Sequence, residues 1–214
     1  MNFLALCKRT RAECHLNGTG PASVLLDSNP KDMQNIINWV ADAWRELQGT
    51  RSWQWQWENP TLTMLAGTAV LAQSIAPTRY DKEATYFLNG GGFLDYLPWE
   101  RFHLIYPANQ IQDGTPTVWS VRPDLALVTN AKPYADTLIS VERYANPTEL
   151  AADTDTPGLP TDLHLHIVWS AVKKYAAHEE AGSLFKTASD EANRIYASIL
   201  DRCLPEYTLG GPLA

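Results

Sequence analysis

Apolar residues follow a helical spacing at both ends of this chain and lose that spacing in the middle. Steps of three and four residues predict helices at 2–14, from 30 to about 49, at 161–180 and at 183–203. A lone helix cannot bury its apolar stripe, so these helices are expected to pack together as a bundle. The longest stripe of the first half is formed by Met33, Ile36, Ile37, Val40, Trp44 and Leu47.

The segment 51–150 has the pattern of a β-sheet. Its short apolar or alternating runs are interrupted by Gly, Pro and Asn, which indicates an antiparallel sheet, sandwich or barrel. The run TVWSVRPDLALVT predicts a hairpin that turns at Arg122 to Asp124, and YADTLISVERYANP predicts a further strand around Leu138. The glycine-rich LNGGGF predicts a hairpin tip or a flexible loop, because no phosphate-binding motif follows it.

The two patterns together predict an α+β fold with an inserted domain. Residues 1–50 and 151–204 form a helical bundle built from the N- and C-terminal helices. Residues 51–150 form an inserted antiparallel β domain, sandwich or barrel-like in kind. Residues 205–214 follow the last helix and its Leu-Pro stop, and are expected to form a flexible C-terminal tail.

Composition and charge exclude some classes of protein. The chain has 214 residues, of which 45% are hydrophobic and 19% charged, so it is long enough for a large core. It carries 17 basic and 24 acidic residues, for a net charge of −7. High-affinity wrapping of a nucleic-acid backbone needs clustered Lys and Arg, so that function is disfavoured.

The N-terminus and the cysteines bear on the compartment. The apolar patch before Lys8 is too short for a signal peptide or a membrane span. Cys7 and Cys14 fall seven residues apart in one predicted helix, about 10 Å along its axis, which is too far for a disulfide. We therefore expect a protein made in a reducing cytoplasm, with no membrane partner.

The sequence offers weak candidates for a metal or catalytic site. Asp153 and Asp155 resemble the start of a calcium loop, but the glycine and glutamate that such a loop needs are missing, so a polar, helix-capping loop is favoured. His164 and His166, two apart on a helix, point about 200° from each other and do not converge on one metal, even with His178 nearby. No nucleophile signature is present. We expect no enzyme activity, cofactor or metal.

The stretch RSWQWQWENP places Trp53, Trp55 and Trp57 at every second position. Alternation predicts a strand with the three indoles on one face. Left exposed, they would form a patch of several hundred Å², roughly more than a monomer tolerates, and a nucleic-acid platform would need basic neighbours. We interpret them as an anchor that fixes the β region to the bundle, or else as a subunit contact.

A second aromatic group lies in LPWERFHLIY. Trp99 and Phe102 flank the charged pair Glu100 and Arg101. A turn whose aromatic side chains anchor the core is favoured here over a ligand platform.

The order of these segments resembles the head-to-tail adaptor, or connector, proteins of short-tailed bacteriophages. The resemblance rests on NFLALCKRTRAEC followed by NGTGPASV, on IINWVADAWRELQ leading into WQWQW, and on GTPTVWSVRPDLALV. The most specific block is YANPTELAADTDTPGLPTDLHLHIVWSAVKKYAAHEE, where an acidic loop, a Pro-x-x-Pro spacing and a helix start occur together. No such pattern matches RYDKEATYFLNGGGFLDYLP.

The resemblance implies a structural protein of the virion neck. Such adaptors form a twelve-fold ring beneath the portal protein and receive a tail or nozzle protein below, while DNA passes through the lumen without specific binding. Neighbouring adaptor subunits are expected to contact each other through the helical bundle. A C-terminal segment docks on the portal. In this chain its residues are Leu204, Pro205, Tyr207, Leu209 and Leu213.

Two other functions remain open at this point. A carbohydrate-binding β module would use the three tryptophans, with Trp99, as stacking surfaces, and would require those rings to be exposed. A hydrolase with His164 or His178 as its base is the weakest alternative, because no nucleophile is paired with either histidine.

Overall fold

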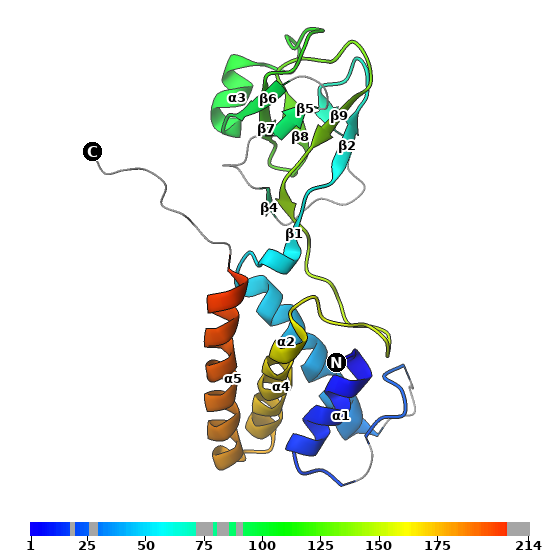
Figure 1. The fold of residues 1–214 in the computed structure, drawn as a ribbon, viewed down its shortest axis with the longest axis vertical. Coiled ribbons are helices and arrows are strands. Elements are labelled where there is room, and N and C mark those ends of the chain that lie inside the picture. The colour runs from blue at the N-terminus through cyan, green and yellow to red at the C-terminus, as the bar shows by residue number, and fades with distance from the viewer. Residues whose placement is uncertain (18–19, 26–29, 72–78, 81–85, 89–91, 205–214) are drawn as a thin grey trace, which may run out of the picture. The chain divides into compact units, whose positions relative to one another are not determined.

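The computed structural model describes residues 1–17, 20–25, 30–71, 79–80, 86–88 and 92–204. The chain divides into two compact units (Figure 1). The helical unit comprises Met1–Gln56 and Pro147–Ala214, and the β unit comprises Trp57–Asn146. Helices and strands both contribute, so the predicted α+β class is confirmed.

The helical unit is built from long helices around one apolar core. Its elements are α1 (Phe3–Glu13), α2 (Lys31–Thr50), the 3₁₀ turns η1 (Gln54–Gln56) and η2 (Thr161–Leu163), α4 (Leu165–His178) and α5 (Gly182–Cys203). Helix α4 packs against α1, α2 and α5, and Figure 1 shows these helices side by side. The stripe predicted on α2 is buried in this core: Met33, Ile36, Ile37, Val40, Trp44 and Leu47.

The start of α1 is held by a loop distant in sequence. Asn2 caps the helix through its side chain, which accepts from the backbone N–H of Ala5. The N–H groups of Phe3 and Leu4 donate to the carbonyls of Asp155 and Asp153, at 2.7 and 3.3 Å. These first-turn donors have no partner within a helix, so the 153–155 loop fixes the position of α1.

The β unit contains short strands in a curled sheet. The larger sheet has the order β2 (Thr61–Met64), β9 (Thr137–Ser140), β5 (Tyr86–Leu88), β6 (Gly92–Tyr96), β7 (Val118–Val121), β8 (Leu127–Thr129) and β3 (Val70–Leu71). Its edge strands β2 and β3 follow each other in sequence and contact each other. A smaller sheet has β10 (Arg143–Tyr144) between β1 (Trp57–Glu58) and β4 (Arg79–Tyr80).

One pairing in the β unit departs from the predicted antiparallel sheet. Strands β6 and β7 run parallel, with Asp95 opposite Val118 and Tyr96 opposite Trp119, whereas the other pairings between described strands are antiparallel. The crossover that a parallel pair requires contains α3 (Trp99–Ile105). The sheet is therefore mixed, and the purely antiparallel expectation was wrong at this position.

The inner face of the sheet is filled by side chains from its successive strands. Alternation along each strand places every second residue on this face, as in the pair Leu62 and Ile139. Trp119 lies at the centre, fully buried, with its ring 4.9 Å from that of Tyr96. The same core contains Met64, Leu71, Leu94, Leu127 and Ile139 from this sheet, Tyr80 from β4 of the smaller sheet, and Val141 after β9.

Local predictions in the β unit had mixed outcomes. The hairpin of β7 and β8 turns at Arg122–Leu125, as predicted, with Leu125 in a left-handed conformation at φ 64°. The strands flanking the glycine-rich run pair as a hairpin, although residues 89–91 lie outside the described residues. The turn predicted at Trp99 is wrong, because residues 99–105 form α3, with Phe102 buried on it.

Candidate functional site

The tryptophan row does not form a strand. Residues 54–56 form the turn η1, in which the N–H of Gln56 donates to the carbonyl of Trp53 at 2.9 Å. The side-chain oxygen of Gln56 in turn accepts from the N–H of Trp53 at 3.3 Å. The row is thereby divided, because Trp53 and Trp55 belong to the helical unit and Trp57 begins the β unit. The alternating-face prediction was wrong because residues 54–56 close a 3₁₀ turn, in which Gln56 bonds back to Trp53, instead of pairing with a neighbouring strand.

Trp53 and Trp55 form an aromatic cluster on the core of the helical unit. Their rings stack with centroids 4.8 Å apart and planes 9° apart. Trp53 is fully buried, and its indole N–H donates to the carbonyl of Leu47 at 2.8 Å. Trp44 and Tyr196 complete the cluster, at 6.3 Å from Trp55 and 6.2 Å from Trp53. A carbohydrate platform needs three exposed rings, so that alternative is contradicted.

The last turn of α5 is fixed on two sides where the C-terminal segment begins. The side-chain amide of Gln54 donates to the carbonyl of Leu204 at 3.0 Å. The guanidinium of Arg202 pairs with the carboxylate of Asp162 in η2, and this ion pair lowers the pKa of Asp162. Leu204 itself packs on the core of the helical unit. We call Gln54, Asp162, Arg202 and Leu204 the exit site. Hydrogen bonds hold it on both sides.

The chain returning from the β unit is held by one buried amide. Gln48, on the last turns of α2, donates to the carbonyl of Thr148 at 2.8 Å and accepts from its N–H at 2.8 Å. These two hydrogen bonds reproduce the pairing of two peptide groups, with the side-chain amide of Gln48 in place of one of them. Outside the core, Arg45 forms an ion pair with Glu149 at 3.3 Å. The end of α2 therefore positions the return of the chain, as η1 positions its departure.

The histidine pair is structural. His164 is fully buried, with Nδ1 2.7 Å from the α-amino nitrogen of Met1 and Nε2 3.0 Å from the carbonyl oxygen of Leu159. His166 donates from Nδ1 to the carbonyl of Ala192 at 3.0 Å. Burial lowers the pKa of both rings. Their nitrogens face different partners, and no group of three metal-ligating side chains occurs among the residues that the structure describes.

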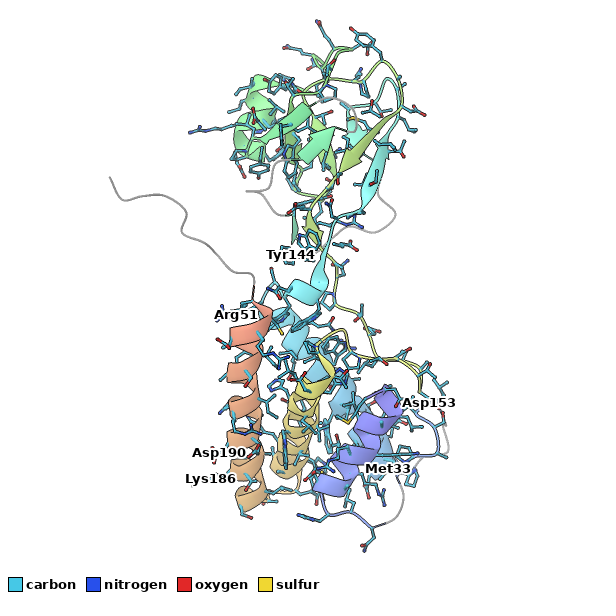
Figure 2. All side chains as sticks on the ribbon, in the orientation of Figure 1. Met33, Arg51, Tyr144, Asp153, Lys186 and Asp190 are labelled. Carbon is cyan, nitrogen blue, oxygen red and sulfur yellow. The ribbon has the colours of Figure 1, made fainter. Side chains whose placement is uncertain are left out.

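The remaining site candidates also have structural contacts. Asp155 accepts from the N–H groups of Ala151 and Ala152 at 2.8 and 2.7 Å, and these bonds lower the pKa of its carboxyl. Asp153, labelled beside α1 in Figure 2, accepts from the N–H of Val24 at 2.7 Å. The loop caps its own turn and α1, so the prediction that it caps the following helix was wrong. His178 is exposed and bonds to Glu179.

The cysteines lie buried and free, as the helical spacing predicted for two of them. Burial raises the pKa of Cys7 and of Cys14 to about 12, and raises that of Cys203. A thiol reacts through its thiolate, so burial disfavours reaction of these side chains at neutral pH.

Comparison with known families decides among the remaining functions. The model of the SU10 adaptor protein family matches residues 1–211. This chain belongs to that family. The match covers both units, and the resemblance to a phage head-to-tail adaptor is thereby confirmed. No curated protein matches the chain.

The family assigns this adaptor a structural part in the virion. Adaptor families of this kind are typically non-enzymatic. None of the described helices is both long and apolar enough to cross a bilayer. A structural adaptor acts through its contact surfaces.

The β unit of the adaptor carries exposed apolar side chains. Leu104 and Ile105 end α3 at 73% and 59% exposure. At one end of the sheet, Tyr134 is 78% exposed although its hydroxyl donates to the carbonyl of Asp113 at 3.2 Å. That end is braced by the N–H of Gly67, which donates to the carbonyl of Pro133 at 2.9 Å. Rigidly held aromatic side chains are typical of protein interfaces.

Sequence reasoning missed the residues that organise the exit site and the return of the chain. Gln48 and Gln54 are glutamines without a motif, and each acts on a residue 100 to 150 positions away. Arg202 and Asp162 likewise lie 40 positions apart. The predicted segment residues Pro205, Tyr207, Leu209 and Leu213 lie outside the described residues. A contact map would have been needed to find the exit site.

Proposed function

We propose that the chain is the neck adaptor that joins the portal of the capsid to the tail, as a ring through which DNA passes. The observation that carries this proposal is the family match over residues 1–211. The proposed partners are the portal protein, neighbouring adaptor subunits in a ring of twelve copies, and a tail or nozzle protein. The protein is placed in the virion neck after synthesis in the host cytoplasm.

The proposed portal contact is the C-terminal segment, with Leu204, Pro205, Tyr207, Leu209 and Leu213. Its first residue is supported by the exit site, so the segment starts from a fixed point of the helical unit. The segment after Pro205 is rich in apolar and small residues and carries a single charge, on Glu206. Such a segment gains apolar contact when it orders on a partner.

The proposed ring contacts use exposed apolar side chains. A ring needs two different complementary faces on each subunit. The β unit offers candidates at Leu104, Ile105 and Tyr134, and Trp57 is 46% exposed at its first strand. Trp57 is therefore our candidate subunit contact, and Trp53 with Trp55 the anchor of the chain segment that enters the β unit.

The proposed lumen does not hold DNA. A net charge of −7 on each chain gives an assembled ring a large negative charge, and like charges repel phosphates at distances up to about 8 Å at physiological salt. Filter binding of assembled rings to duplex DNA tests this point, and retention that persists at physiological salt argues against it.

We further propose that the two units are domains in the folding sense, divided near residues 50 and 150. Each has its own apolar core. Expression of residues 57–146 alone tests the division, because an autonomous β domain unfolds cooperatively.

Truncation tests the central proposal. Deletion of residues 205–214 is expected to abolish co-sedimentation with purified portal rings, while the thermal unfolding midpoint stays within about 2 °C of the parent, since a surface change typically costs less than about 0.5 kcal/mol. A truncated chain that still sediments with the portal would refute the assignment of this segment. A chain that no longer folds would show instead that the segment is part of the helical unit.

A further inference from the structure

The exit site fixes more than the position of Leu204. The carbonyl oxygen of Leu204 belongs to the peptide group that joins residues 204 and 205, and a peptide group is planar. The amide of Gln54 donates to this oxygen at 3.0 Å. Holding the oxygen therefore holds the plane of the first peptide group of the segment.

Two further restraints act on the same point. Leu204 has an extended conformation, with φ −80° and ψ 144°, which is the conformation that a following proline favours. Since residue 205 is a proline, its ring restricts its own φ to about −65°. On the preceding side, the ion pair of Arg202 with Asp162 and the burial of Cys203 fix the last turn of α5. The chain is therefore held from the last turn of α5 up to the carbonyl of Leu204.

Gln54 is suited to this task because it has no part in the core. Its side chain is exposed, unlike those of its neighbours Trp53 and Gln56. The backbone of η1 that carries it is itself fixed by the stacking of Trp53 on Trp55. Gln54 is thus a donor on a rigid support, three residues before the chain enters the β unit.

We propose that Gln54 is a positioning residue, which sets the direction in which the portal-binding segment leaves the helical unit. This proposal rests on the proposed function for the identity of the partner, but not for the direction itself. A segment aimed in advance loses less conformational freedom when it binds. One hydrogen bond corresponds to roughly a twofold to tenfold change in an equilibrium constant, and that is the expected gain in portal affinity.

The test compares donors and non-donors at position 54 in the full chain. Gln54→Glu keeps the shape of the side chain and removes the N–H donor, whereas Gln54→Lys restores a donor. Gln34→Glu is the matched control, because Gln34 is exposed on α2 and makes the same charge change far from Leu204. All variants are expected to share the thermal unfolding midpoint of the parent, which separates aiming from folding.

The direct readout is the distance between two spin labels. One is attached at Lys186→Cys on the exposed face of α5 (Figure 2) and the other at Glu206→Cys, and the three native cysteines are buried and stay unlabelled. Double electron–electron resonance is expected to give the same distribution of distances in the parent, in Gln54→Lys and in Gln34→Glu. Gln54→Glu is expected to broaden it.

Portal binding provides the second readout. Co-sedimentation with portal rings is expected to weaken roughly twofold to tenfold in Gln54→Glu and to recover in Gln54→Lys. Suppose that deletion of 205–214 abolishes portal binding, while Gln54→Glu binds portal rings and gives the same label distances as the parent. The positioning role is then overturned and the proposed function stands. If the deletion leaves binding intact, the proposed function fails, and the label distances alone decide whether Gln54 directs the segment.

Discussion

The helical unit and the β unit differ in how completely each buries its apolar side chains. In the described part of the helical unit, the large apolar side chains left exposed are Leu25 and Phe185. The β unit is smaller, yet it exposes Trp57, Leu65, Val70, Phe93, Leu104, Ile105, Leu125, Tyr134 and Leu138. Apolar side chains that gather in one exposed patch mark contact sites, whereas scattered ones are ordinary surface. We infer that partners cover part of this apolar surface of the β unit.

The strongest test of this difference uses the tryptophan row, which is divided between the two units. Trp53→Ala removes a buried ring, its stacking partner and the hydrogen bond to Leu47. We expect it to lower the free energy of unfolding by about 3–5 kcal/mol. Trp57→Ala removes a ring that is 46% exposed, and should cost about 1 kcal/mol or less.

Urea unfolding measures both losses, and hydrogen exchange locates them. Trp53→Ala should speed exchange in α2 and α5, and Trp57→Ala should affect β1 and β10 alone. Equal losses for the two variants would contradict the division of the row between core and surface.

The next largest effect on stability is expected at Gln48, which bonds to the chain where it returns from the β unit. Gln48→Ala removes both hydrogen bonds to Thr148. Because Thr148 is itself exposed, water can replace the lost amide, and we expect a net loss of about 0.5–1.5 kcal/mol. Gln34→Ala removes an exposed contact to Asn38, and should change stability by less than about 0.5 kcal/mol. The difference between their urea midpoints checks this expectation, and similar midpoints would show that the amide pairing is dispensable.

The same contrast explains which parts of the fold could be predicted. Helices α2 and α5 extend over 20 and 22 residues, long enough for the stripe of buried positions to repeat several times, and both were predicted within two residues of their ends. Strands of 2 to 5 residues contain only one or two alternations of inward and outward positions. So short a pattern also occurs in the 3₁₀ turn η1, and the sequence does not distinguish the two. The parallel pairing of β6 with β7 depends on α3, a short helix without a repeat of its own.

The exit site shows a second limit of prediction. The sequence reveals that a helix ends near Leu204, because a proline follows. It does not reveal that Gln54 reaches the carbonyl of Leu204, since a single polar contact between distant residues leaves no periodic pattern. The spacing of His164 and His166 predicts that they do not share a metal, because residues two apart on a helix point in different directions. It does not predict their partners, the carbonyls of Leu159 and Ala192.

A milder effect should follow from acid in the helical unit. Burial lowers the pKa of His164 and His166 below the value of an unfolded chain, near 6.5. Below that pH the unfolded state takes up more protons than the folded state, so stability falls as the pH drops from 7 towards 5. The groups facing His166 are the carbonyl of Ala192, the hydroxyl of Ser170 and the ring of Tyr196, without a carboxylate.

Unfolding midpoints at pH 7.0 and pH 5.5 measure this loss. His166→Asn cannot titrate and should flatten the dependence on pH, although its stability at pH 7 is lower. The carboxyls of Asp155 and Asp162 have lowered pKa values and act only at more acidic pH. A dependence as steep in His166→Asn as in the parent would contradict the role of this ring.

The smallest effect on stability should accompany the largest contrast in assembly. Leu104→Ser with Ile105→Ser removes exposed apolar groups of the β unit, and Leu25→Ser does so in the helical unit at a similar exposure. Each change should alter the free energy of unfolding by less than about 0.5 kcal/mol for each position. If partners cover the apolar surface of the β unit, sedimentation should show that the double variant in α3 no longer joins portal-bound rings. Leu25→Ser should assemble as the parent does. Normal assembly of the α3 variant would mean that this exposed pair is ordinary surface, and equal impairment by Leu25→Ser would mean that both units contribute apolar contacts to the neck.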